Sequence, residues 1–182
     1  MKIGTKSVLF GAHAFWLHPW FVAWAWTKLY GFPTDYRLWV AFFVHDLGYV
    51  GKPNMDGPEG EDHVQLGGSL MRRWFGFEWR LFTLCHSRYF CKKWGVRPSA
   101  LCYADKLATV LIPWWIYVPL VRLTGEIREY KSAAKHRAEH GAWDDTTWRG
   151  DRAWFQSLQK HLEGWTLENA PQIERERTRV PA

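Results

Sequence analysis

The sequence predicts an all-α protein, a single helical bundle with a polar site in its core. Val and Ile do not alternate with polar residues over any useful length, so no strand is predicted. Apolar residues recur at helical spacing instead, and Gly and Pro divide the chain into helix-sized segments. The 182 residues, 47% of them hydrophobic, are enough for one domain with a sizeable core.

Residues 19–30 are predicted to form the first helix, and a second helix ends at the pair His45-Asp46. Pro19 favours the first helical position, and Gly31 ends this helix. Thr34 or Asp35 caps the second helix. Residues 48–60 follow as an irregular loop, because the four Gly and two Pro of this short segment oppose regular structure. A long loop directly after a His-Asp pair is typical of functional sites.

The remaining helices are predicted from the same kinds of signal. Gly76, Gly95 and the Pro98-Ser99 pair separate them, so we expect helices over residues 61–74, 78–94, 99–121, 126–140 and 151–162. The bundle therefore covers residues 1–169, with a core portion over about 13–121 and C-terminal helices over 122–169. Residues 170–182 are polar and are predicted to form a frayed tail.

Residues 107–121 form an apolar run without a charged side chain. A membrane-spanning helix needs about 20 such residues, more than this run provides, and Pro113 and Pro119 interrupt it. We therefore expect a buried, kinked core helix and no transmembrane segment. Trp114, Trp115 and Tyr117 favour membrane interfaces, which leaves peripheral membrane contact as the alternative.

Charge and cysteine content narrow the class of protein. The net charge of +6 and a pI near 9.3 favour anionic ligands, but no Lys/Arg block is long enough for a nucleic-acid stripe, so specific nucleic-acid binding is not expected. Three Cys without regular spacing argue against a disulfide framework. Reduced thiols and a cytoplasmic location follow as the expectation, whereas the oligomeric state is not indicated.

Histidines and aspartates form an ordered series with helix-scale spacing. Its members are His18, His45-Asp46, His63, His86 and Asp105, with His13 as the alternative to His18. Each separation fits one helix and a turn, so the side chains can converge in a bundle core. Such nitrogen and oxygen ligands suit one or two divalent transition-metal ions: iron, manganese, cobalt, zinc or nickel.

The surroundings of the two Asp support a metal site. Asp46 follows the apolar run AFFV, and Asp105 lies within LCYADKLATVL. A buried carboxylate costs several kcal/mol unless it is paired or bound to a cation. Lys106 can pair with one of the two, so a cation is the simplest explanation without being the only one.

The ordered series resembles the ligand order of the HD superfamily, in particular of its binuclear branch. HDLGYVGKPNMDG is similar to the segment after the His-Asp pair of HD-GYP phosphodiesterases, HVQLGGSLM to their next helix, and YADKLA to their last ligand motif. The likeness covers about residues 13–110. It implies an HD-domain bundle in which Asp46 bridges two ions.

Two departures limit what the resemblance implies. Tyr49 stands where the HD-GYP motif has Lys, although Lys52 follows three residues later, and SRYFCKKWG after His86 lacks the GYP signature. Cyclic-dinucleotide hydrolysis is therefore not implied. Asp46, Tyr49 and Lys52 are predicted as catalytic residues. Arg88 and Lys92, expected one turn along the helix from His86, are predicted with Lys52 to bind substrate phosphate.

Three functions follow as hypotheses. The first is metal-dependent hydrolysis of a nucleotide or small phosphoester by a metal-activated water. The second is a mixed-valent di-iron oxygenase of the HD type, although we expect the final Asp of such an enzyme to lie farther from the last His than Asp105 lies from His86. The third is a non-catalytic binding protein with a vestigial metal site, in which the aromatic surface serves a partner.

Overall fold

The computed structural model of the protein describes residues 1–139 and 146–171, and it is all-α with no strand among these residues. Its α-helices are α1 (Ile3–Phe10), α2 (His18–Tyr30), α3 (Tyr36–Val44), α4 (Pro58–Glu61), α5 (Val64–Phe75), α6 (Phe77–Leu84), α7 (Arg88–Trp94), α8 (Ala100–Leu111), α9 (Trp114–Thr124), α10 (Glu126–Glu139) and α11 (Asp151–Asn169). Two short 3-10 helices, η1 (Leu47–Tyr49) and η2 (Thr147–Arg149), complete the set.

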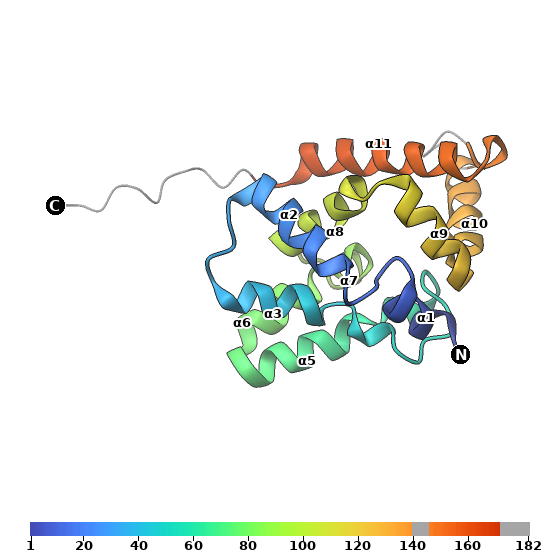
Figure 1. The fold of residues 1–182 in the computed structure, drawn as a ribbon. Coiled ribbons are helices and arrows are strands. Elements are labelled where there is room, and N and C mark those ends of the chain that lie inside the picture. Colours follow the sequence, from blue (N-terminus) through green and yellow to red (C-terminus); the bar gives the residue numbers. More distant parts are fainter. Residues whose placement is uncertain (140–145, 172–182) are drawn as a thin grey trace.

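The helices pack around two large apolar clusters and a small third one, formed by Val8, Tyr49 and Met55. The larger cluster lies between α2, α3, α5 and α8 and includes Val22, Trp26, Phe42 and Leu101. The second lies between α9, α10 and α11 and includes Trp154. Figure 1 shows α11 along one side of the molecule, over α8 and α9, and α5 on the opposite side.

The predicted start and stop signals are found at several helix ends. Pro19 lies in the first turn of α2, and Gly31 follows it at φ +87°. Asp35 caps α3 by accepting a hydrogen bond from the Arg37 N–H at 2.9 Å. Gly95 ends α7 in a left-handed conformation. Each of these residues starts or ends its own helix, so these helix boundaries could be predicted from the sequence.

The predicted single helix over residues 78–94 was wrong: the chain breaks there into α6 and α7. Ser87 causes the break, because its hydroxyl accepts a hydrogen bond from the Phe90 N–H at 3.2 Å and caps a new helix. His86 therefore lies in the turn between the helices. Arg88 and Lys92 are consequently not one turn further along the helix that precedes His86.

Other boundaries also differ from the predictions. α1 and the one-turn helix α4 were not predicted, and η1 begins the segment expected to be irregular. α11 extends beyond residue 162 to Asn169. The predicted end of the charged helix at residue 140 and most of the predicted frayed tail, residues 172–182, lie outside the described residues.

The apolar run over residues 107–121 forms two helices rather than one kinked helix. α8 and α9 meet at 102° around Ile112 and Pro113. Among the described residues, no single helix is long and apolar enough to cross a membrane, and only this bent pair passes that test when its two helices are joined. The Trp115 side chain is 62% exposed, so the apolar run is not fully buried in the core.

Two glycines bring α5 close to its neighbours. A Cβ added at Gly67 would lie 2.6 Å from the Val44 carbonyl oxygen and 3.0 Å from the His45 Cα. A Cβ at Gly68 would lie 2.8 Å from the Leu84 side chain of α6. At Gly67 the clash would be with backbone atoms, so only glycine permits the approach that brings the end of α3, with His45, against α5.

Gly67→Ala is therefore expected to lower the stability of the protein. The added methyl forces α3 and α5 apart, which we expect to cost about 2 kcal/mol. Thermal unfolding measures the loss. Gly164→Ala in α11 is the matched control: its Cβ meets nothing within 4 Å, so it should stabilise the protein by about 1 kcal/mol. Equal stability of the two variants would contradict this account of the helix crossing.

Candidate metal centre

The six predicted ligands come together from five places in the fold. His18 is the first residue of α2, His45 and Asp46 follow the end of α3, His63 precedes α5, His86 lies between α6 and α7, and Asp105 is inside α8. All six are buried, with exposures of 1% to 8%. Five of them lie at helix ends or in turns, where backbone groups are open to hydrogen bonding.

The Asp46 carboxylate lies between two groups of side chains. Its Oδ2 is 3.0 Å from His45 Nε2 and 3.4 Å from His18 Nε2. Its Oδ1 is 3.4 Å from His86 Nε2 and 3.6 Å from His63 Nε2. One oxygen thus serves each group, as expected of a carboxylate that bridges two positions.

Asp105 completes the first of these groups. Its Oδ1 lies 3.0 Å from His18 Nε2 and 3.8 Å from His45 Nε2. Its Oδ2 accepts a hydrogen bond from Lys106 Nζ at 2.8 Å. Asp105 therefore faces the site with one oxygen while the other is held by a cationic side chain.

Backbone carbonyls fix the orientation of three imidazoles. Nδ1 lies 2.9 Å from the Phe42 carbonyl oxygen in His45, 2.8 Å from that of Gly60 in His63 and 2.6 Å from that of Thr83 in His86. A carbonyl only accepts, so each Nδ1 carries a proton. Each ring is thereby turned so that Nε2 points at Asp46, the arrangement found for histidine ligands of metals.

The chemistry of the site fits a cation. Nε2 of His63 and of His86 lie 3.0 Å apart, and Nε2 of His45 and Oδ2 of Asp46 are buried without a hydrogen-bond partner. Leaving such clustered polar atoms unsatisfied costs free energy unless a ligand binds them. The ligand atoms of His18, His45, Asp46 and Asp105, and likewise those of Asp46, His63 and His86, lie within 4.8 Å of one another. Each buried group could hold one metal ion.

Charges within the cluster shift its protonation. Burial alone would raise the pKa of both carboxyls, but His45 and other imidazoles hold the pKa of Asp46 well below its usual range, and Lys106 and His18 do the same for Asp105. Burial opposes charge on His45, yet the two aspartates raise its pKa to about 10. At neutral pH the His45 imidazole would therefore carry a second proton, and an ion bound at Nε2 would have to displace it.

His13, the alternative first ligand, lies beside the cluster instead of in it. Its Nδ1 is 2.9 Å from the Ser7 hydroxyl, and its ring centroid is 5.7 Å from that of His18. Burial lowers the pKa of His13 to about 4, so its imidazole is neutral at physiological pH. His18 belongs to the candidate metal group, and His13 forms part of the neighbouring cavity wall.

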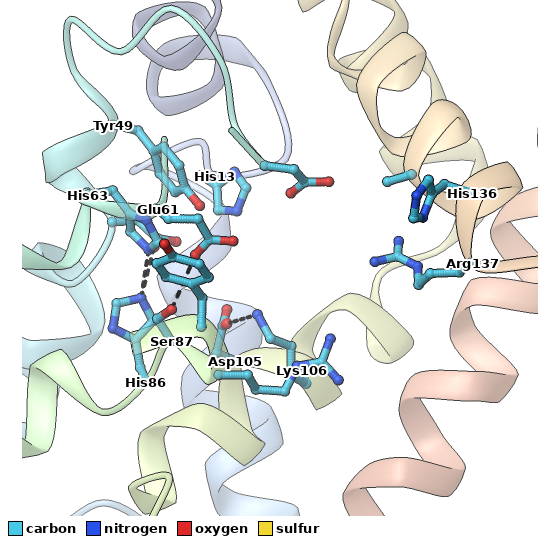
Figure 2. Close-up of a pocket in the computed structure, with 15 residues that line it drawn as sticks. His13, Tyr49, Glu61, His63, His86, Ser87, Asp105, Lys106, His136 and Arg137 are labelled. Carbon is cyan, nitrogen blue, oxygen red and sulfur yellow. Dashed lines mark hydrogen bonds and ion pairs between the residues drawn. The ribbon is translucent and has the colours of Figure 1, made fainter. Parts of the chain in front are cut away.

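A cavity of about 420 Å³ opens beside the cluster. Asp46, His63, His86 and Asp105 contribute to its wall, so four of the six candidate ligands are accessible from it. Figure 2 shows His136 and Arg137 of α10 facing the His63, His86 and Asp105 side across this cavity. Lys106 and Arg88 also line it. The cavity therefore joins a group of metal-type ligands to basic side chains.

The other predicted site residues are placed differently from one another. Tyr49 lines the cavity and stacks on the His63 ring, with centroids 3.9 Å apart; burial and the nearby Asp46 raise its pKa well above the usual value. Arg88 lines the cavity and lies over the Trp165 ring. Lys52 and Lys92 are not among the residues that line the cavity. The Lys52 backbone carbonyl accepts a hydrogen bond from the Gly4 N–H at 3.1 Å, and the Lys92 side chain is exposed.

Sequence reasoning did not assign several residues of the cavity wall. Glu61, Asp56, His136 and Arg137 line it, and Lys106 was considered only as a partner of an aspartate. The position of Lys106 next to Asp105 is a signal that could have been used. Arg137 carries none, because only the packing of α10 brings it to the site.

Comparisons with protein-family models, with curated proteins and with solved structures found no significant match.

Proposed function

We propose that this protein is a metal-dependent phosphohydrolase of the HD type that acts on a nucleotide or another small phosphoester. The observation that carries the proposal is the Asp46 carboxylate, whose two oxygens face two separate ligand groups at the wall of a cavity. Iron, manganese, cobalt, zinc and nickel all suit ligands of this kind. Two ions bridged by Asp46 are the arrangement we favour.

One set of side chains would bind the ions, and another would bind the substrate phosphate. His18, His45 and Asp105 would hold one ion with Asp46, and His63 and His86 the other. A loaded centre supplies a water of lowered pKa and neutralises charge on phosphoryl oxygens. Tyr49 would keep the His63 ring in place through its stacking contact.

Three basic side chains support an anionic substrate. Arg88, Lys106 and Arg137 all contribute to the cavity wall, and guanidinium and ammonium groups form strong, charge-assisted hydrogen bonds to phosphate oxygens. Lys106 also neutralises Asp105 through its 2.8 Å contact. The Lys106 ammonium would therefore contact both the Asp105 carboxylate and the substrate phosphate.

Arg88→Ala tests the phosphate contact. Loss of a charge-assisted hydrogen bond typically costs about 1.5–3 kcal/mol, so kcat/KM for a phosphoester should fall roughly tenfold to a hundredfold. The measurement is phosphate release by protein loaded with manganese, cobalt or iron. Lys92→Ala, an exposed position on the same helix, is the matched control and should leave kcat/KM unchanged. Equal losses in both variants would contradict the proposed contact.

Other outcomes separate the alternative functions. No turnover of any phosphoester by protein with metal confirmed bound would contradict phosphohydrolysis. A mixed-valent electron paramagnetic resonance signal after anaerobic iron loading, together with oxygen uptake, would support the oxygenase. Metal content without either activity would support a binding protein with a vestigial site.

A further inference from the structure

A second, smaller cavity of about 170 Å³ adjoins the one beside the metal ligands. The two cavities share part of their walls, formed by His13, Tyr49, Asp56, Arg88, Lys106 and Arg137. Four candidate metal ligands line the larger cavity, whereas only His18 of the six lines the smaller one. Arg88, Lys106 and Arg137 thus lie where the two spaces meet, together with the carboxyl group of Asp56.

Outside the shared residues, His18 and Thr109 are polar, and the other side chains that line the smaller cavity are aliphatic or aromatic. Its wall comes mainly from α9, α10 and α11 and includes Tyr117, Ala134, Trp154, Leu158 and Leu162. Trp154 is only 1% exposed, and Tyr117 stacks on Phe155 with ring centroids 4.3 Å apart. The side chains that form this wall are held by the second apolar cluster, so the cavity is a formed feature of the core.

From this arrangement we infer that the protein selects phosphate monoesters whose organic group is apolar and about the size of one ring. The phosphate would lie at the shared basic wall and face the metal ligands, and the apolar group would enter the smaller cavity. The volume supports this size, because a cavity of about 150 Å³ is known to accept benzene. The inference rests on the proposed function, since it concerns the substrate of that same site.

Binding of two phosphonates tests the inference without requiring turnover. Zinc-loaded protein, which has no redox chemistry, is titrated calorimetrically with phenylphosphonate and with methylphosphonate. Both carry the same anionic group, and only the first has a ring. Burial of a ring of this size should make phenylphosphonate bind roughly tenfold to a hundredfold more tightly.

Two variants link the preference to the smaller cavity. Ala134→Leu on α10 places a larger side chain at a buried wall position, so it should remove the advantage of phenylphosphonate and leave methylphosphonate binding unchanged. Leu158→Ala enlarges the space and should favour naphthylphosphonate over phenylphosphonate. Leu167→Ala, at an exposed position on the same helix as Leu158, is the control and should change neither ratio.

The outcomes separate this inference from the proposed function. Equal affinity for the two phosphonates would overturn the inference and leave phosphohydrolysis standing. Failure of both to bind would overturn the anion site and the inference together. A phenyl preference that survives both Ala134→Leu and Leu158→Ala unchanged would also overturn it. If Ala134→Leu does not fold, the wild-type ratio and Leu158→Ala still decide.

Discussion

Replacement of Asp46 by alanine is expected to abolish turnover and to lower the metal content of the purified protein. Both Asp46 oxygens face imidazole nitrogens, at 3.0–3.6 Å, and they belong to different ligand groups. The variant therefore loses a ligand of both groups at once. Loss of metal-based catalysis is worth several kcal/mol, so kcat/KM should fall by at least about a thousandfold. Phosphate release and elemental analysis measure the two effects.

Asp35→Ala provides the comparison for Asp46→Ala. Asp35 caps α3 at the end opposite to His45 and takes no part in the ligand cluster. Its loss should cost about 1 kcal/mol of stability, typical for an N-cap, and leave metal content unchanged. An Asp46→Ala protein with full metal occupancy and full turnover would show that the ligand cluster is not the functional site.

Glu126→Ala is expected to produce the largest loss of stability. The Glu126 carboxyl is fully buried and accepts hydrogen bonds from the Ser7 hydroxyl at 2.9 Å, the Ala12 N–H at 3.3 Å, the Thr124 hydroxyl at 2.5 Å and the Tyr130 hydroxyl at 2.9 Å. Removing the acceptor leaves buried donors unsatisfied, which costs on the order of 3 kcal/mol or more. Thermal or urea unfolding measures the loss. The exposed Glu163 is the control, and Glu163→Ala should change stability by less than about 0.5 kcal/mol.

The same carboxyl should make stability depend on pH. Burial raises the pKa of Glu126 above its usual value, despite the four hydrogen bonds. The folded protein therefore holds this proton more tightly than the unfolded chain does. The contribution is fully present below the ordinary glutamate pKa and is lost as the pH rises through the folded-state pKa. Glu126→Gln stays neutral and should lack this slope, so parallel pH profiles of the two proteins would contradict the assignment.

The sequence was most informative where a short-range signal decides the structure. Pro19, Gly31 and Asp35 act on their own helix ends, and apolar residues at helical spacing were sufficient to predict the all-α class. The ordered His and Asp residues at helix-scale spacing predicted the ligand cluster. The break at Ser87 could not be read in advance, because a serine inside an apolar, helical pattern carries no unique signal. The role of Arg137 could not be predicted for another reason. Its place at the cavity depends on how α10 packs, and α10 lies far along the chain from Asp105, the last predicted ligand.

The hydrogen bonds between imidazole Nδ1 and backbone carbonyls would also affect how the protein acquires the proposed ions. His45, His63 and His86 are each tied to a carbonyl three residues earlier, so their rings lose rotational freedom when the chain folds and not when an ion arrives. In small zinc-dependent folds, ion binding and folding are a single event. Here two apolar clusters hold the helices independently of the ligands. The candidate ligands are therefore preorganised, and we expect uptake of an ion to depend on ion supply and on access through the cavity.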